Sequence, residues 1–409
     1  MSGIGGVDFS STDRARVQEV LALLKEKGTL DELGIGQVRD AFSDLLFPGF
    51  STIQTTARYF LAVPKILRAW AALTPQQRRK QPLSDYLAEA ENQLAEELAE
   101  NHKRKELSLE GIIGHTLIES GGVARRPSST YWNGLRVFNI IRSEKSLAEF
   151  CREWRQEGAE SDAVDSEEGT DDGDGRFESE VKLPPVTREL RPNELTLRLS
   201  KTEATFLSTQ FKMARGHTDS VAAQLLSAGL VVPAISEEHQ RFEAFSVWAA
   251  NQKTLSQRCR DRITTAQRFS LAVEGAHITF NRLLAKLLPN DKLGALCEYE
   301  LPSWKTRAAQ AGVFHDGAPQ EWLGTGVSET KSFKMLSVNF LHSWNSALCH
   351  GASQSKLDDL VEKQAIANKP GRSLLVRLPR KASDWYGMKE LDYRWPTARR
   401  MLLDITGAL

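Results

Sequence analysis

Hydrophobic positions recur at helical spacing along most of the chain. Val17, Val20, Leu21 and Leu24 form one such set near the start, and spacings of three and four residues place side chains on one face of an α-helix. Alternating patterns that would indicate strands are short, and only Leu195 to Leu199 and Leu374 to Leu378 are candidates. The pattern therefore predicts a mainly α, multi-helical protein.

The stretch from Ser84 to His102 predicts a long amphipathic helix. Leu87, Ala90, Leu94 and Leu98 would face inward, and the many glutamates would form the outer rim.

Two features of the second half also predict helices. Ser200 and Glu203 match a capping box, in which each side chain satisfies a backbone N–H of the other residue. The stretch from Gln252 to Leu288 is apolar on most sides, which is typical of a central core helix. The alternative use of this stretch is a docking surface for a partner enzyme.

An acidic segment divides the chain. Between Glu157 and Glu180 there are eleven carboxylates and one base, Arg176, so this segment carries −10, and the rest of the neutral chain carries +10. Low apolar content and dense charge predict disorder here. We therefore expect a helical domain over 1–156, a linker over 157–185 and a second helical domain over 186–409.

Composition adds limits on the class of protein. The chain has 409 residues, 41% of them hydrophobic, and four widely spaced cysteines without a CxxC pair. These favour free thiols in a reducing compartment. Neither a membrane-spanning apolar run nor an apolar leader after Met1 is visible, so we expect a cytoplasmic protein with no membrane partner.

The stretch from Phe47 to Phe60 is the first candidate site. Pro48-Gly49 predicts a turn, and Ser51 with Gln54 predicts a capping box that starts a helix. A helix start also attracts anions, because its free N–H groups and its dipole act together. The stretch is therefore either a capped helix or a phosphate contact, for which the candidate residues are Thr55, Arg58 and Tyr59.

A second stretch, from Ala124 to Arg136, repeats this chemistry with more positive charge. Pro127 would fix the entry to a helix capped by one of the following serines, with Ser129 as its start. Gly114 to Arg142 is a candidate helix-turn-helix or winged-helix-like unit. A local cap explains the same residues without a ligand. The candidate nucleic-acid contacts are Arg125, Arg126, Ser128, Ser129, Tyr131 and Arg136.

The C-terminal tail interleaves basic and aromatic residues from Arg372 to Arg400. Such a mixture can stack bases and follow a nucleic-acid backbone. The alternative is that Trp385 and Trp395 are core anchors and that the bases are solvated.

Enzyme signatures are not evident. Phosphate-binding, dinucleotide, nucleophile-elbow and zinc-protease motifs do not occur in the sequence. Glu180-Val181-Lys182, with Asp165 or Asp174 upstream, loosely matches a metal-dependent nuclease pattern. We therefore predict no catalytic residues, no metal ligands and no cofactor, and keep a cryptic nuclease as an alternative.

Several blocks of the sequence resemble a bacterial family known only as a domain of unknown function. The likeness covers nearly the whole chain outside the acidic segment, although Thr56 stands where the family pattern has Arg. The blocks are Val7 to Ser10, Leu33 to Gly36, Arg39-Asp40, Phe47 to Phe60, Ser128 to Leu135, Glu203-Ala204, Arg268 to Ser270, Gly275-Ala276, Asn281 and Leu391 to Trp395.

The resemblance implies a context and no catalytic residues. Genes of such families tend to lie in defence-type neighbourhoods, beside helicases and phospholipase-D-like nucleases. We therefore expect a non-enzymatic accessory subunit of a bacterial anti-phage or DNA-processing system that binds DNA or a nucleoprotein partner. The alternative is a structural adaptor that docks a helicase or nuclease.

Overall fold

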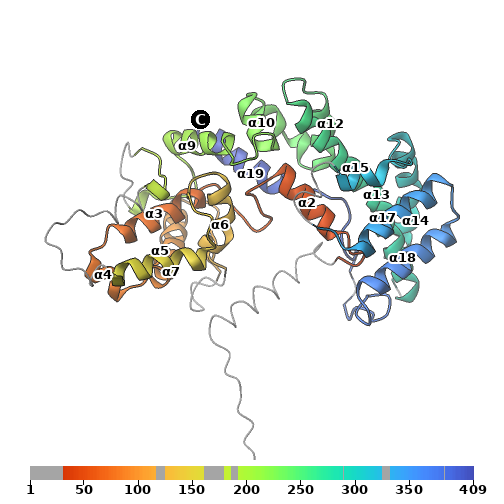
Figure 1. Ribbon diagram of the computed structural model, residues 1–409, viewed down its shortest axis with the longest axis horizontal. Helices are drawn as coiled ribbons and strands as arrows, with labels where there is room; N and C mark the ends of the chain where they lie inside the picture. Colours follow the sequence, from red (N-terminus) through yellow and green to blue (C-terminus); the bar gives the residue numbers. More distant parts are fainter. Residues whose placement is uncertain are drawn as a thin grey trace, which may run out of the picture. The chain divides into compact units, whose positions relative to one another are not determined.

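The computed structural model describes residues 31–116, 125–160, 179–185, 192–288, 290–324, 332–381 and 383–409, with side chains of α7 described up to Trp154. Helices account for nearly all of its regular structure (Figure 1). The prediction of a mainly α protein is confirmed. The helices of the described part include none that is both long and apolar enough to cross a membrane.

The described residues form two compact units that are interleaved in the sequence. Unit 1 contains Phe47–Glu237 and Arg394–Leu409, and unit 2 contains 31–46 and Glu238–Tyr393. The chain thus returns to unit 1 for its last helix, whereas the predicted domains were consecutive. Most of the acidic linker, 161–178, lies outside the described residues.

The described helices of unit 1 come from two parts of the chain. They are α3 (Tyr59–Ala71), α4 (Pro75–Lys80), α5 (Leu83–Arg104), α6 (Pro127–Val137), α7 (Leu147–Glu160), η2 (Pro192–Glu194), α9 (Lys201–Lys212), α10 (Val221–Ser227), α11 (Val231–Ala234) and α19 (Trp395–Thr406). A short 3-10 helix, η3 (Glu237–His239), follows where the chain enters unit 2.

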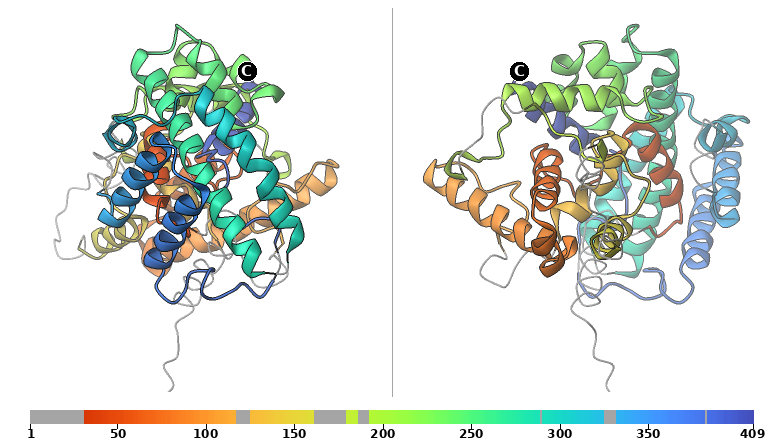
Figure 2. Two further views of the ribbon diagram at one scale, coloured as in Figure 1. Left: turned by 90° about the vertical axis from the view of Figure 1, so that its right-hand side faces the viewer. Right: turned by 60° about the vertical axis from the view of Figure 1, so that its left-hand side comes forward.

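The helices of unit 2 surround one long helix. They are α2 (Gly36–Leu46), α12 (Phe242–Ala250), α13 (Gln257–Leu287), α14 (Asp291–Gln310), α15 (Ala318–Gly324), α17 (Met335–Cys349) and α18 (Gln354–Asn368). The long helix α13 contacts α2, α12, α14, α15 and α18. Helices α17 and α18 lie side by side (Figure 2).

The prediction that Gln252 to Leu288 contains a core helix is confirmed. Residues from Phe269 to Asn281 of α13 are buried almost without interruption. The indole N–H groups of Trp304 and Trp344 donate to the carbonyls of Leu271 and Ala272, at 2.7 and 2.9 Å. The apolar faces that the adaptor alternative would need are therefore covered within unit 2.

Aromatic side chains form the core of unit 1. The ring of Phe60 on α3 contacts those of Tyr131, Phe138 and Phe211, with centroids 4.9, 5.4 and 5.3 Å apart. Phe50 adds contacts with Phe138 and Phe211. Edge-to-face pairs of this kind add to the stability from burial alone. The cluster joins the segment before α3 to α6 and α9.

The two candidate strands are not formed. Leu195 to Leu199 is an irregular segment after η2, and Leu374 to Leu378 forms turns. The described residues contain one isolated antiparallel bridge, between Ile141 and Val181. One isolated bridge pairs only a single residue of each segment, which is too little to stabilise a strand. The core is built by helix packing instead.

The helix predicted from Ser51 begins only at Tyr59, and it then continues through Pro64. Gln54 Oε1 accepts the Ser51 N–H at 3.2 Å, which is half of the predicted box, but the Ser51 hydroxyl has no partner among the described residues. The backbone from Thr55 to Ala57 instead makes tertiary hydrogen bonds. These compete with a helix over the same residues.

The helix-turn-helix prediction also receives no support from the described residues. Residues 112–116 form turns, and 117–124 lie outside the described part. The following helix, α6, begins at Pro127 and not at Ser129, and no side chain caps it at Arg126. Proline is favoured at the first helical position, because its fixed φ suits a helix and its missing N–H is not needed there.

Two helical glycines at the α13–α14 contact offer a matched test of packing. A Cβ added to Gly275 would lie 2.1 Å from the Trp304 ring, whereas one added to Gly294 would lie 3.8 Å from the nearest atom, Ala285 Cβ. We expect Gly275→Ala to destabilise the protein by about 1–3 kcal/mol through overpacking. Gly294→Ala should stabilise it by about 0.5–1 kcal/mol through helix propensity.

Urea unfolding followed by circular dichroism would measure both changes. Equal stability of the two variants would contradict this packing of Trp304 on α13.

Candidate ligand pocket and its polar frame

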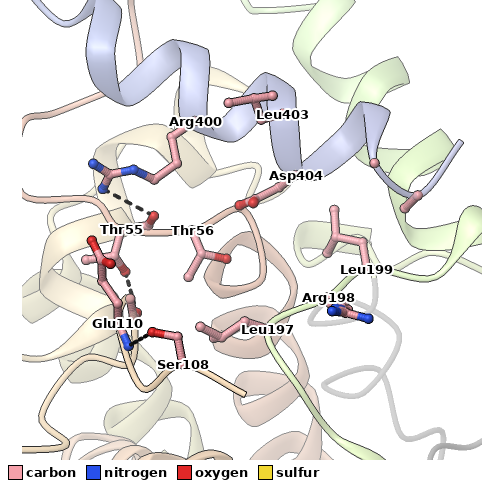
Figure 3. A pocket seen from close by; sticks show the side chains of 13 residues that line it. Thr55, Thr56, Ser108, Glu110, Leu197, Arg198, Leu199, Arg400, Leu403 and Asp404 are labelled. Carbon is pink, nitrogen blue, oxygen red and sulfur yellow. Dashed lines mark hydrogen bonds between the residues drawn. The ribbon is translucent and has the colours of Figure 1, made fainter. Parts of the chain in front are cut away.

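Unit 1 contains a pocket of about 640 Å³. Four segments that are far apart in the sequence form its walls: Thr55-Thr56, Ser108 to Gly111, Leu197 to Leu199, and the last helix, α19, from Arg400, together with Gly407 and Ala408 that follow it. Figure 3 shows side chains of all four segments around it. This volume is in the range of small-molecule sites, which are roughly 300–1,000 Å³.

The Tyr131 hydroxyl fixes the first wall. It accepts the N–H groups of Thr55 and Thr56 at 2.8 and 3.0 Å and donates to the Thr56 carbonyl at 2.8 Å. Its ring is fully buried, and burial raises its pKa to about 12. The neutral hydroxyl can therefore both accept and donate, as this irregular backbone requires.

A buried ion pair connects the first wall to the third. Arg58 Nη1 donates to Glu203 Oε1 at 2.6 Å, and both side chains are at most 7% exposed. The other terminal nitrogen, Arg58 Nη2, donates to the carbonyl of Arg198. Burial opposes the charge of Glu203, but Arg58 and the Ser200 N–H outweigh it and hold its pKa at about 2. Glu203 also completes the predicted capping box with Ser200, which is confirmed.

The imidazole of His102, at the end of α5, joins the second and third walls. Its Nδ1 lies 2.6 Å from the Ser108 carbonyl, and its Nε2 accepts the Leu197 N–H at 3.1 Å. Only a neutral ring with its proton on Nδ1 satisfies both contacts. The walls are thus linked by side chains from helices beneath them.

The fourth wall presents charge. Asp404 Oδ2 accepts the Ala57 N–H at 2.7 Å, and burial is the main reason that its pKa is raised. One turn earlier on α19, the exposed Arg400 places Nη1 3.5 Å from the Thr55 carbonyl. Across the pocket, the Arg198 guanidinium is exposed, and no described residue forms an ion pair or hydrogen bond with it.

The start of α6 already has a hydrogen-bond acceptor from the protein itself. Glu91 of α5 is completely buried and accepts the Ser128 N–H in the first turn of α6. Arg126 Nη1 lies 3.9 Å from its other oxygen. Burial outweighs these contacts and raises the pKa of Glu91 to about 7. The N–H groups at this helix start were predicted to bind a phosphate. One of them, that of Ser128, thus donates to a carboxyl group of the protein instead.

The structure brings four of the nine predicted site residues together. Thr55 lines the pocket and donates its hydroxyl to the Gly111 carbonyl at 2.8 Å. Arg58 and Tyr131 are buried beneath it, and Tyr59 packs on Tyr131 with ring centroids 5.4 Å apart. These three residues hold the frame and present no polar surface to solvent.

The other five predicted residues lie along α6. Ser128 is buried, Ser129 is exposed and donates to the Arg126 carbonyl at 2.9 Å, and Arg125 is half-buried. Arg126 donates to the Ala88 carbonyl at 2.6 Å. At the other end of the helix, Arg136 donates to the carbonyls of Ser143 and Glu144. A nucleic-acid contact by these residues stays a prediction.

The site residues predicted from the sequence did not include Glu91 and Asp404. Glu91 was placed on the outer rim of α5, yet it follows Leu87 by four residues and precedes Leu94 by three, so it lies on the apolar face. Asp404 lies likewise between Met401 and Ile405, which are both buried. An acid at an apolar position of a helix was the available signal.

The other residues with possible catalytic or metal-binding chemistry do not form a site in the described part of the chain. No group of three or more His, Cys, Asp or Glu side chains there could hold a metal ion. In the nuclease-like pattern, Val181 pairs with Ile141, and Asp165 and Asp174 lie outside the described residues. All four cysteines are free, as predicted.

Fold and site together define a helical protein with a ligand-sized pocket, lined by both charged and apolar side chains and built against its last helix. The chain belongs to a family of unknown function, DUF6361, whose model matches residues 1–408. The resemblance stated above is confirmed at this level. Comparisons with curated proteins and with solved structures found no match.

Removing the Tyr131 hydroxyl should weaken the frame of the pocket. Tyr131→Phe leaves the N–H groups of Thr55 and Thr56 buried without an acceptor, so we expect a loss of about 1–3 kcal/mol in unfolding free energy. Tyr86→Phe is the control, because that hydroxyl bonds to no described residue. Chemical denaturation measures the unfolding free energy of both variants. Equal losses in Tyr131→Phe and Tyr86→Phe would contradict this role of the Tyr131 hydroxyl.

Glu91 should make stability depend on pH. Its carboxyl keeps a proton up to about pH 7 when folded but only to about 4.5 when unfolded, so its contribution to stability is complete below 4.5 and is lost as the pH rises through 7. Relative to Glu91→Gln, the wild type should lose on the order of 3 kcal/mol over this window.

Denaturant melts at several pH values would test this difference, with Glu96→Gln, an exposed acid on the same helix, as the control. A wild-type to Glu91→Gln difference that does not change with pH would show that folding does not shift the pKa of this carboxyl.

Proposed function

We propose that the protein is a non-enzymatic, cytoplasmic accessory subunit of a bacterial anti-phage or DNA-processing system, and that it binds DNA at the pocket of unit 1. One observation carries the proposal. Arg198 and Arg400 line the pocket from two separate walls, and both side chains are exposed. Exposed arginines that are fixed at their base are well suited to phosphate oxygens.

The frame supports this use of the two arginines. The carbonyl of Arg198 is held by the buried Arg58, and Arg400 is anchored in α19, whose next turn is tied to Ala57 through Asp404. A backbone that is already fixed loses little further conformational entropy on binding. The +10 charge outside the acidic segment adds a weak long-range attraction for a polyanion.

The proposal changes the roles of the residues predicted from the sequence. Thr55 stays a candidate contact, because it lines the pocket. Arg58, Tyr59 and Tyr131 become the support beneath it. A helicase or nuclease partner stays part of the proposal, but the covered helix α13 does not offer the surface for it.

DNA binding should depend on salt and on the two pocket arginines. We expect labelled DNA to bind at low salt and to be released as salt rises. Arg198→Gln and Arg400→Gln should each weaken binding and lower the slope of log K against log salt by roughly 0.7–0.9, the value for one lost phosphate contact. Fluorescence anisotropy at several salt concentrations measures both quantities.

Arg142→Gln is the matched control, since Arg142 is an exposed arginine of unit 1 that does not line the pocket. A loss that follows Arg125→Gln instead would place the contact at α6. Absence of binding at low salt, to either single- or double-stranded DNA, would overturn the proposal.

A further inference from the structure

Residues 369–381 form an irregular loop of unit 2 that follows α18 (Figure 1). Hydrogen bonds hold the backbone of this loop in two places. Glu32, a buried acid of the same unit, accepts the Leu374 N–H at 3.1 Å. At the far end of the loop, the Tyr386 hydroxyl donates to the Lys381 carbonyl at 3.0 Å. The side chains of the loop are therefore carried by a backbone that the rest of unit 2 holds in place.

Four basic side chains of this loop are exposed and have no partner in the described part of the chain, so we call it the basic loop. They are Arg372, Arg377, Arg380 and Lys381. Lys369 differs from them, because it forms an ion pair with Glu32 at 2.7 Å. The sequence from 370 to 383 contains no acid. The basic loop therefore presents four positive charges to solvent that the protein does not neutralise.

The aromatic residues that follow the basic loop are used by the fold. Tyr386, Tyr393 and Trp395 are buried. Trp385 is half-buried, its indole N–H donates to the Met388 carbonyl at 3.0 Å, and the Nζ of Lys389 lies 5.2 Å from its ring centroid. A nucleic-acid base would therefore find no fully exposed ring among these four residues on which to stack. A ligand of the basic loop has to be recognised by its charge.

The chemistry of the basic loop suits a phosphate backbone better than an acidic protein. Two exposed aliphatic side chains, Val376 and Leu378, lie between the cations. A stable protein interface needs a larger apolar centre than these two side chains supply. A DNA duplex instead carries one negative charge about every 1.7 Å along its axis. Three of the four free cations are arginines, whose planar groups match phosphate oxygens.

We infer that the basic loop is a second DNA-contacting surface, which holds the sugar-phosphate backbone and does not read the base sequence. The inference rests on the proposed function only for the identity of the ligand. It goes beyond that function, which places DNA at the pocket of unit 1, because it assigns a contact to unit 2 that involves none of the pocket residues.

The experiment measures binding of a labelled mixed-sequence duplex to the full-length protein by fluorescence anisotropy at several salt concentrations. The loop variant combines Arg377→Gln and Arg380→Gln. We expect it to bind about tenfold more weakly and to lower the slope of log K against log salt by about 1.8, the value for two lost contacts with a duplex. Both side chains are exposed and unpaired, so circular dichroism should show an unchanged fold.

The matched control combines Lys292→Gln and Lys356→Gln, which removes the same charge from two exposed positions of unit 2 outside the basic loop. Its affinity and salt slope should stay close to those of the wild type. A loop variant that loses no more affinity than this control would overturn the inference. The proposed function would stand in that case if Arg198→Gln and Arg400→Gln still weaken binding.

A protein that carries both Arg198→Gln and Arg400→Gln isolates the basic loop. We expect this protein to retain binding that the loop variant then removes. Retained binding of this kind, at the full wild-type affinity, would support the inference and overturn the pocket as the DNA site. No binding of DNA by the wild type at low salt would overturn both proposals.

Poly-L-glutamate tests the alternative of an acidic protein partner, because it carries carboxylates and no phosphate. Added to the protein without the pocket arginines, it should displace the labelled duplex less well than an unlabelled duplex at the same concentration of charge. Equal displacement by the two competitors would assign the basic loop to acidic polypeptides and overturn DNA as its ligand.

Discussion

The hydroxyl group of Tyr131 is the contact on which the site depends. From Gln54 to Arg58 the chain is largely buried but not helical, so its backbone groups need partners from elsewhere in the protein. Three of them, two N–H groups and one carbonyl, form hydrogen bonds with the Tyr131 hydroxyl. A fourth, the Ala57 N–H, donates to Asp404 of the last helix. An irregular wall in a helical protein is stable here because two distant helices satisfy it.

Buried carboxyl groups explain why positive charge and helix starts are not free for ligands in much of unit 1. Glu203 forms an ion pair with Arg58, and Glu91 accepts an N–H in the first turn of α6. The two acids differ in ionisation, because Glu203 meets a guanidinium at 2.6 Å whereas Glu91 has Arg126 only at 3.9 Å. Direct hydrogen bonding from a cation therefore decides which acid keeps its charge after burial.

Helices and their local caps could be predicted well, and the pocket could not. The Ser200–Glu203 box and the core position of α13 depend on residues within a few turns of one another, and both are confirmed. The start of α3 was predicted wrongly, because the signal at Ser51 and Gln54 is local whereas the competing bonds come from residues 131 and 404. Thr55 was found as a candidate, but its neighbours in the pocket come from three other parts of the chain.

The sequence by itself determined the helical class, the amphipathic faces and the free cysteines, since each follows from spacing or composition. Only the tertiary structure decided which polar residues would be frame and which would be surface. Arg58 and Arg400 have the same side-chain chemistry, yet one is buried on a carboxylate and the other is exposed at the pocket. That difference depends on which helix lies opposite, because a charge can be buried only where a partner from another segment meets it.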